Sequence, residues 1–193
     1  MPLALTTKLQ ATNALLAAVR QAPVQTIAGD LGADTAMAVA LLEDRSRAVQ
    51  SAGWHWNTVP KLTLSPNTSG EIVLPEGVVS ADPVPGEYTD IDVTVRGEKL
   101  FDKKNATYTF TKDVKVTATY LLDWTELPEQ ARSYIFHSAA RRFQDRLLGS
   151  REDHFYQQQD EAEALAILKL WDSEQADNSI FQADVTLNSL LRY

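Results

Sequence analysis

The feature that most constrains the fold is a change of hydrophobic period along the chain. Apolar residues recur at helical spacing before residue 57, alternate with polar residues over 58–124, and return to helical spacing from residue 125. The middle region is too small to stand apart from the helices. We therefore predict an α+β fold, in which an antiparallel bundle of about four helices (1–57 and 125–176) carries a small antiparallel β region (58–124).

Two helices are predicted in the first zone. The first covers about Thr7 to Arg20, and Pro23 ends it. The second has Asp34 as its N-cap and Gly53 as its stop signal. The residues expected on their buried faces are Leu9, Leu16 and Ala17 in the first helix, and Ala38, Leu41, Leu42, Ala48, Val49 and Ala52 in the second.

Two further helices are predicted after the β region. The third begins at Leu127-Pro128-Glu129, because proline favours the first turn, and ends at Gly149. The fourth runs from about Glu152 to Ala176. The residues expected on the buried faces are Phe136, Ala140, Phe143 and Leu147 in the third helix, and Phe155, Ala162, Leu165, Ala166 and Leu168 in the fourth.

The middle zone is rich in threonine and tyrosine and is divided by turn residues, such as Ser65-Pro66-Asn67 and Gly97-Glu98. Apolar residues alternate with polar ones in three runs, around Leu62, Val93 and Val116. We predict roughly four to six short antiparallel strands here.

The last segment, residues 177–193, lacks clear periodicity but is apolar. A segment of this kind should dock on another surface rather than remain in water. We therefore predict an extended C-terminal arm. Its candidate interface residues are Phe181, Val185, Leu187, Leu190, Leu191 and Tyr193.

Composition excludes several classes of site. The chain has no cysteine and three histidines, so we expect no disulfide, no metal and no cofactor. The formal net charge of −8 argues against a protein that grips DNA, although an acidic face would let DNA slide past. No signal peptide or membrane-spanning run is visible, which predicts synthesis in a cytoplasm and no membrane contact.

Catalytic motifs are also missing from the sequence. His137 and Ser138 are adjacent, and neighbours on a helix point about 100° apart, so they do not form a nucleophile–base pair. The acidic residues of the last helix are interpreted as a solvated face. A rival hypothesis is a peptidoglycan or polysaccharide hydrolase that uses carboxylates of the β region. Its candidate residues are Asp82, Glu87, Asp90 and Asp92.

Two other motifs could bind a partner. Trp54 and Trp56 flank His55, and such rings could stack on a sugar or a base. We favour a structural role, in which both rings share one face of an extended strand at the junction after the second helix. Arg141 and Arg142 are expected to pair with local acids or with a neighbouring subunit rather than with phosphate.

Four blocks of the sequence stand in a characteristic order and spacing, which is more specific than any one of them. They are Ala11–Leu16 with Ala22–Ile27 and Gly29-Asp30; Arg47–Asn57; Arg96–Asp102; and Glu126–Glu129 with Tyr134-Ile135, Ala139–Phe143 and Gly149. Together these blocks resemble the tail tubular protein A family of podoviruses, which are short-tailed bacteriophages, so the rival hydrolase would be a tail-associated one. One departure is Arg20-Gln21-Ala22, where the family commonly has a glycine before the Pro-Val pair.

This resemblance implies a structural virion protein without enzymatic activity. It implies a homo-oligomeric ring of about twelve copies that joins the portal of the capsid to the tail nozzle protein, tail tubular protein B. DNA would pass through the lumen without sequence-specific binding, and a tail fibre is a further possible partner. The C-terminal arm, with Arg141 and Arg142, would then contact neighbouring subunits or the portal.

Overall fold

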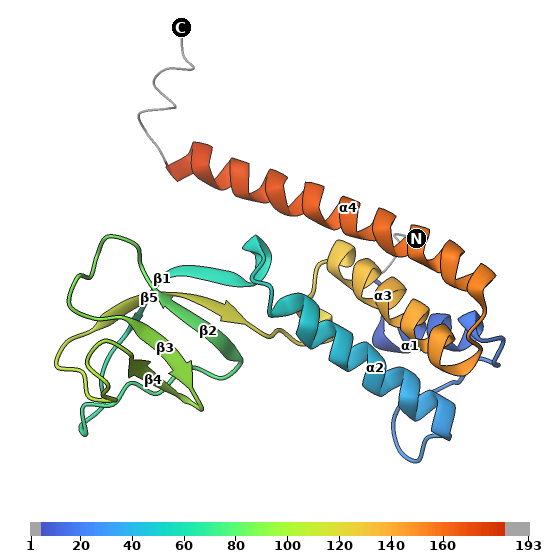
Figure 1. The fold of residues 1–193 in the computed structure, drawn as a ribbon, viewed down its shortest axis with the longest axis horizontal. Coiled ribbons are helices and arrows are strands. Elements are labelled where there is room, and N and C mark those ends of the chain that lie inside the picture. Colours follow the sequence, from blue (N-terminus) through green and yellow to red (C-terminus); the bar gives the residue numbers. More distant parts are fainter. Residues whose placement is uncertain (1–4, 184–193) are drawn as a thin grey trace, which may run out of the picture. The chain divides into compact units, whose positions relative to one another are not determined.

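The computed structural model describes residues 5–183, with side chains described up to residue 176. It shows an α+β fold, as predicted, with helices at both ends of the described chain and small antiparallel sheets between them (Figure 1). These residues form two compact units. The helical unit contains the chain up to Val49 and from Asp123 onward, and the β unit is Gln50–Leu122.

Four α-helices are described: α1 (Lys8–Ala18), α2 (Ala33–Gln50), α3 (Glu129–Leu147) and α4 (Arg151–Ala183). Helix α3 packs against both α1 and α4 (Figure 1). All four helices contribute fully buried side chains to the core. These include Leu15, Leu16, Leu42, Ile135, Phe143 and Leu168. Helix α4 continues beyond the expected end at Ala176, so any extended arm begins after Ala183.

Details of the predicted helices need correction. Asp34 is not an N-cap: α2 begins at Ala33, and Asp34 lies in the first turn, where the helix dipole still favours a carboxylate. Several residues expected in the core are exposed. Five are alanines, which add little apolar area and identify no face, and the other two lie near the α3–α4 turn. The alanines are Ala17, Ala48, Ala52, Ala162 and Ala166, and the other two are Leu147 and Phe155. Polar residues that the periodicity missed are buried instead, namely Thr12, Arg132, Ser138 and Gln144.

Arg132 shows how a buried charge is accommodated in the helical unit. Only 4% of it is exposed. Its guanidinium donates hydrogen bonds to three backbone carbonyl oxygens, those of Leu127 (2.9 Å), Thr6 (3.0 Å) and Thr125 (2.8 Å). Trp124 Nε1 donates to the same Thr6 carbonyl oxygen at 3.0 Å. Because each nitrogen of the buried guanidinium donates a hydrogen bond, the cation fixes the segment before α1 against the start of α3.

The β unit contains five strands, which agrees with the predicted number. A three-stranded antiparallel sheet has the order β1 (Thr58–Leu64), β5 (Val114–Tyr120), β2 (Val78–Pro83). A hairpin joins β3 (Val93–Arg96) to β4 (Lys99–Asp102). Gly97 in its two-residue turn has φ +63°, a conformation that favours glycine. The unit has its own apolar core, which includes Ile72, Val93, Leu100, Val114 and Val116.

Two buried amide side chains join the ends of the β unit. Asn57 Nδ2 donates to the carbonyl oxygens of Gln50 and Tyr120, both at 2.8 Å, and its Oδ1 accepts from the Trp54 N–H at 2.8 Å. Gln50 Oε1 accepts from the Leu122 N–H at 2.7 Å, and its Nε2 donates to the Leu122 carbonyl oxygen at 3.2 Å. The chain therefore enters and leaves the unit at one place.

We predict that Asn57→Ala lowers the free energy of unfolding by about 2–4 kcal/mol, because it leaves one amide and two carbonyl groups without their partner. Urea denaturation followed by tryptophan fluorescence measures this loss. Gln158→Ala removes an exposed amide of α4 and serves as the control. If the two variants were equally stable, the amide junction would contribute nothing to the fold.

Candidate interaction surfaces

Arg141 is held inside the helical unit. Its Nε donates to Glu161 Oε2 on α4, and its Nη1 lies 3.8 Å from Asp145 Oδ2 on α3. The hydrogen bond to Glu161 raises the pKa of Arg141. Burial alone would raise the pKa of Glu161, but hydrogen bonds from Arg141 and Ser138 outweigh it, so this pKa lies below its ordinary value. Arg141 thus pairs with local acids.

The same polar network extends to α2. Arg45 Nε donates to Ser138 Oγ on α3 at 2.9 Å. Burial lowers the pKa of Arg45, and the nearby charge of Arg142 lowers it further. Ser138 therefore bridges an arginine of α2 and a carboxylate of α4. Its role in this network is structural rather than nucleophilic. The network joins three of the helices through side chains alone.

Arg142 is the exposed member of the arginine pair. No carboxylate of the described residues lies within 4 Å of its guanidinium, so its charge faces solvent. The other candidate interface residues fall where side chains are not described. Phe181 lies on the last turns of α4. Outside the described residues are Val185, Leu187, Leu190, Leu191 and Tyr193.

The carboxylates of the rival hydrolase hypothesis are exposed on the β unit. Three of them form ion pairs with three different lysines: Glu87 with Lys115 (3.2 Å), Asp90 with Lys112 (3.1 Å) and Asp92 with Lys103 (3.1 Å). Asp82 accepts a hydrogen bond from the Ser80 hydroxyl at 3.1 Å. The hydrogen bond from Lys112 lowers the pKa of Asp90. A general acid needs the opposite shift, so Asp90 is poorly suited to that role in glycoside hydrolysis.

Trp54 and Trp56 lie at the junction between α2 and β1, as expected, but not on an extended strand. Residues His55–Asn57 form a 3₁₀ turn, and both tryptophans are half-buried beside an exposed His55. Because successive residues of such a turn point in different directions, the two rings do not form one stacking platform. The residues of this segment that hold the structure together are instead Gln50 and Asn57. The hydrophobic pattern of the sequence does not identify them.

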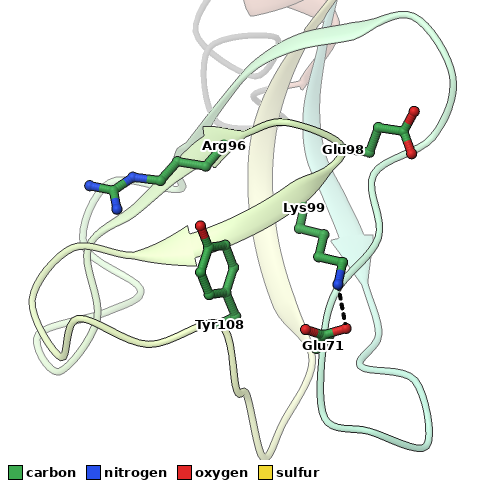
Figure 2. A pocket seen from close by; sticks show the side chains of 5 residues that line it. All are labelled: Glu71, Arg96, Glu98, Lys99 and Tyr108. Atoms are coloured by element: carbon green, nitrogen blue, oxygen red, sulfur yellow. Dashed lines mark hydrogen bonds and ion pairs between the residues drawn. The ribbon is translucent and has the colours of Figure 1, made fainter.

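A hollow of about 440 Å³ lies on the β3–β4 hairpin and is lined by charged side chains (Figure 2). Lys99 Nζ donates to Glu71 Oε2 at 2.7 Å, whereas Arg96 and Glu98 point away on opposite sides (Figure 2). The Arg96 guanidinium lies 3.7 Å from the centroid of the Phe101 ring. These groups can bind polar side chains of a partner, but they include no activated nucleophile or base.

Large apolar side chains of α4 are exposed within the part of the chain that the structure describes. They are Phe155 (55%), Tyr156 (59%), Ile167 (51%) and Leu170 (64%). The opposite side of the helix is buried at Ala164 and Leu168. The sequence analysis had placed Phe155 on the buried side of this helix, and the structure shows it exposed instead.

The described part of the chain offers little for other chemistry. It contains no group of three His, Asp or Glu side chains that could hold a metal ion. None of its helices is long and apolar enough to cross a membrane.

A family model described as tail tubular protein matches residues 9–178. The match includes most of α4 and the whole of the β unit, so it covers both units rather than one module. No curated protein matches the chain.

We predict that Glu161→Gln lowers the free energy of unfolding by about 1 kcal/mol at pH 7, because a partly exposed ion pair with Arg141 is lost. The folded pKa of Glu161 is depressed, so its stabilisation is present above the unfolded pKa of about 4.3 and is lost as pH falls through the folded value. The difference in the free energy of unfolding between the wild type and Glu161→Gln should therefore shrink in acid, as measured by urea denaturation at several pH values. Glu163→Gln, an exposed change on the same helix, is the control. A difference that stayed constant below pH 3 would rule out the ion pair as its cause.

Proposed function

Because this chain belongs to the tail tubular protein family, we propose that its copies form a closed ring in the tail of a short-tailed bacteriophage. Family membership makes the chain a structural protein of the phage tail. The proposal adds that a ring of about twelve copies joins the portal to the nozzle protein and forms part of the conduit for DNA. The extent of the family match, across both units, is the observation that carries it.

The exposed apolar side chains of α4 support assembly into a multi-copy structure. Exposed aromatic and aliphatic side chains occur at four positions of α4, two near its start (Phe155 and Tyr156) and two further along (Ile167 and Leu170), and exposed apolar side chains of this size favour a covering partner. The polar network around Arg141 and Glu161 fixes α4 against α3, so these side chains are held on a rigid element. Rigid, preformed surfaces of this kind suit permanent contacts between subunits.

The charge of the chain supports a conduit rather than a DNA clamp. With a net charge of −8 per copy, a ring would repel the phosphate backbone and let it pass. On the β unit, Lys103, Lys112 and Lys115 are each paired with a carboxylate, which removes much of their attraction for phosphate. DNA would therefore cross the lumen without sequence-specific binding.

The C-terminal segment is proposed to contact a neighbouring subunit or the portal. The backbone of α4 is helical to Ala183, so this contact would come from the end of a long helix and the residues after it. Arg142, with its exposed charge, is the second candidate contact of the same kind. Arg141 is less suited to that role because Glu161 already binds it.

We predict that native mass spectrometry of the pure protein mixed with its cognate portal shows a closed ring of the 21.4 kDa chain bound to the portal. A monomer that forms the ring only when portal is present would show templated assembly. A ring already present without portal would show spontaneous assembly. A chain that stays monomeric and ignores the portal would contradict the proposed function.

A further inference from the structure

Arginines of the helical unit gather on α2 and α3 with too few acidic partners. Arg141 binds Glu161 and lies close to Asp145. Arg45 of α2 and Arg142 of α3 form no ion pair with a carboxylate among the residues whose side chains the structure describes. The cluster therefore holds more positive than negative charge, in a chain whose overall charge is negative.

The side chain of Arg45 lies over one side of α3. Its Nε donates to Ser138 Oγ at 2.9 Å, and its side chain also forms a hydrogen bond with Tyr134. Tyr134, Ser138 and Arg142 recur every four residues, so they share this side of α3 at intervals of about 6 Å. Burial lowers the pKa of Arg45, and the positive charge of Arg142 lowers it further. The two guanidinium groups are therefore neighbours.

Neighbouring guanidinium groups repel each other unless an anion lies beside both of them. The carboxylate of Glu161 attracts Arg45. However, it already accepts hydrogen bonds from Arg141 and Ser138. The buried Arg132 shows the contrast, because each of its nitrogens donates to a carbonyl oxygen. Arg45 has hydroxyl partners alone within the described side chains, so N–H donors remain for an anion.

A carboxylate suits this arginine pair better than a phosphate of DNA. Guanidinium groups bind carboxylates through parallel N–H donors. The net charge of −8 repels a duplex. With 26 acidic residues against 18 lysines and arginines, each copy has carboxylates that its own cations do not neutralise. Copies of so acidic a chain also need opposite charges where they meet, because like charges at a contact disfavour it.

We propose that Arg45 and Arg142 together bind a carboxylate of a second copy of this chain. Arg142 is exposed and can reach the other copy, whereas Arg45 is half-buried and is held in place by Ser138. The bound carboxylate removes the repulsion between the two guanidinium groups. The inference rests on the proposed ring and names a polar contact between its copies.

Zero-length crosslinking tests the contact directly. Arg142→Lys places a primary amine at the site, and a carbodiimide joins an amine to a carboxylate that touches it. Rings assembled on the portal from isotope-labelled and unlabelled chains should give peptides that join residue 142 of one chain to an Asp or Glu of the other. Arg47→Lys is the matched control. Arg47 is also exposed, but it already pairs with Asp44, so its link should stay within one chain.

Mass spectrometry of the linked peptides separates the outcomes. A link from residue 142 to a carboxylate of its own chain would overturn the inference, because the arginine pair would then be satisfied within one copy. A link to the portal would overturn the choice of a second copy. If residue 142 formed no link while the Arg47→Lys control reacted, no carboxylate would lie at the site.

Charge reversal tests the strength of the same contact. Arg142→Glu should weaken the association of copies on the portal by about ten- to a hundredfold, the effect expected for a charge-assisted hydrogen bond, while its circular dichroism spectrum stays that of the wild type. Arg151→Glu, at an exposed arginine in the first turn of α4, is the control for the change in net charge. Equal association of Arg142→Glu and wild type would overturn the inference.

A labelled DNA duplex distinguishes carboxylate from phosphate. Fluorescence anisotropy should show no binding of the duplex to the wild type. Binding that Arg142→Glu abolishes would assign the arginine pair to phosphate and overturn the inference.

The proposed function and this inference fail differently. Wild-type chains that form no ring even with portal would remove both. Wild-type rings that Arg142→Glu leaves unchanged would remove the inference alone.

Discussion

The amide junction of Gln50 and Asn57 is the contact on which both units depend. The β unit interrupts the helical sequence, so its two ends must meet before α2 and α3 can belong to one fold. Closing so long a loop costs conformational entropy that local contacts have to offset. Hydrogen bonds from Asn57 to the carbonyl oxygens of Gln50 and Tyr120 help to offset this entropy cost, as do those between Gln50 and the backbone of Leu122. The β unit can then be inserted without separating the helices.

Within the helical unit, a partly buried polar network adds to the apolar core in holding α2, α3 and α4 together. Ser138 sits at its centre, between Arg45 of α2 and Glu161 of α4. Apolar packing alone would not choose a side for α4, because apolar residues occur on several sides of it. The hydrogen bond between Arg141 of α3 and Glu161 of α4 places one side of α4 against α3. As a result, the side with Leu170 is left outside, where another chain can reach it.

Sequence reasoning succeeded where one residue type enforces a local geometry. Gly149 and Gly97 adopt positive φ at the end of α3 and in the β3–β4 turn, as their positions indicated. It failed where alanine carried the pattern, because residues such as Ala48 and Ala162 fit either side of a helix. Contacts between residues distant in sequence, such as Asn57 with Tyr120, leave no periodic signal. The exposed side of α4 was also missed, since Phe155 was expected to be buried.

These observations describe a structural chain with rigid apolar surfaces and a surplus of negative charge, which agrees with a component of a phage tail. The claim that unites them is the proposed assembly of identical copies into a closed ring at the junction of portal and tail. Electron cryomicroscopy of the assembled tail tests it most directly. The account predicts a closed ring of copies of this chain between the portal and the nozzle protein. A map with a single copy, or with none at that level, would contradict it.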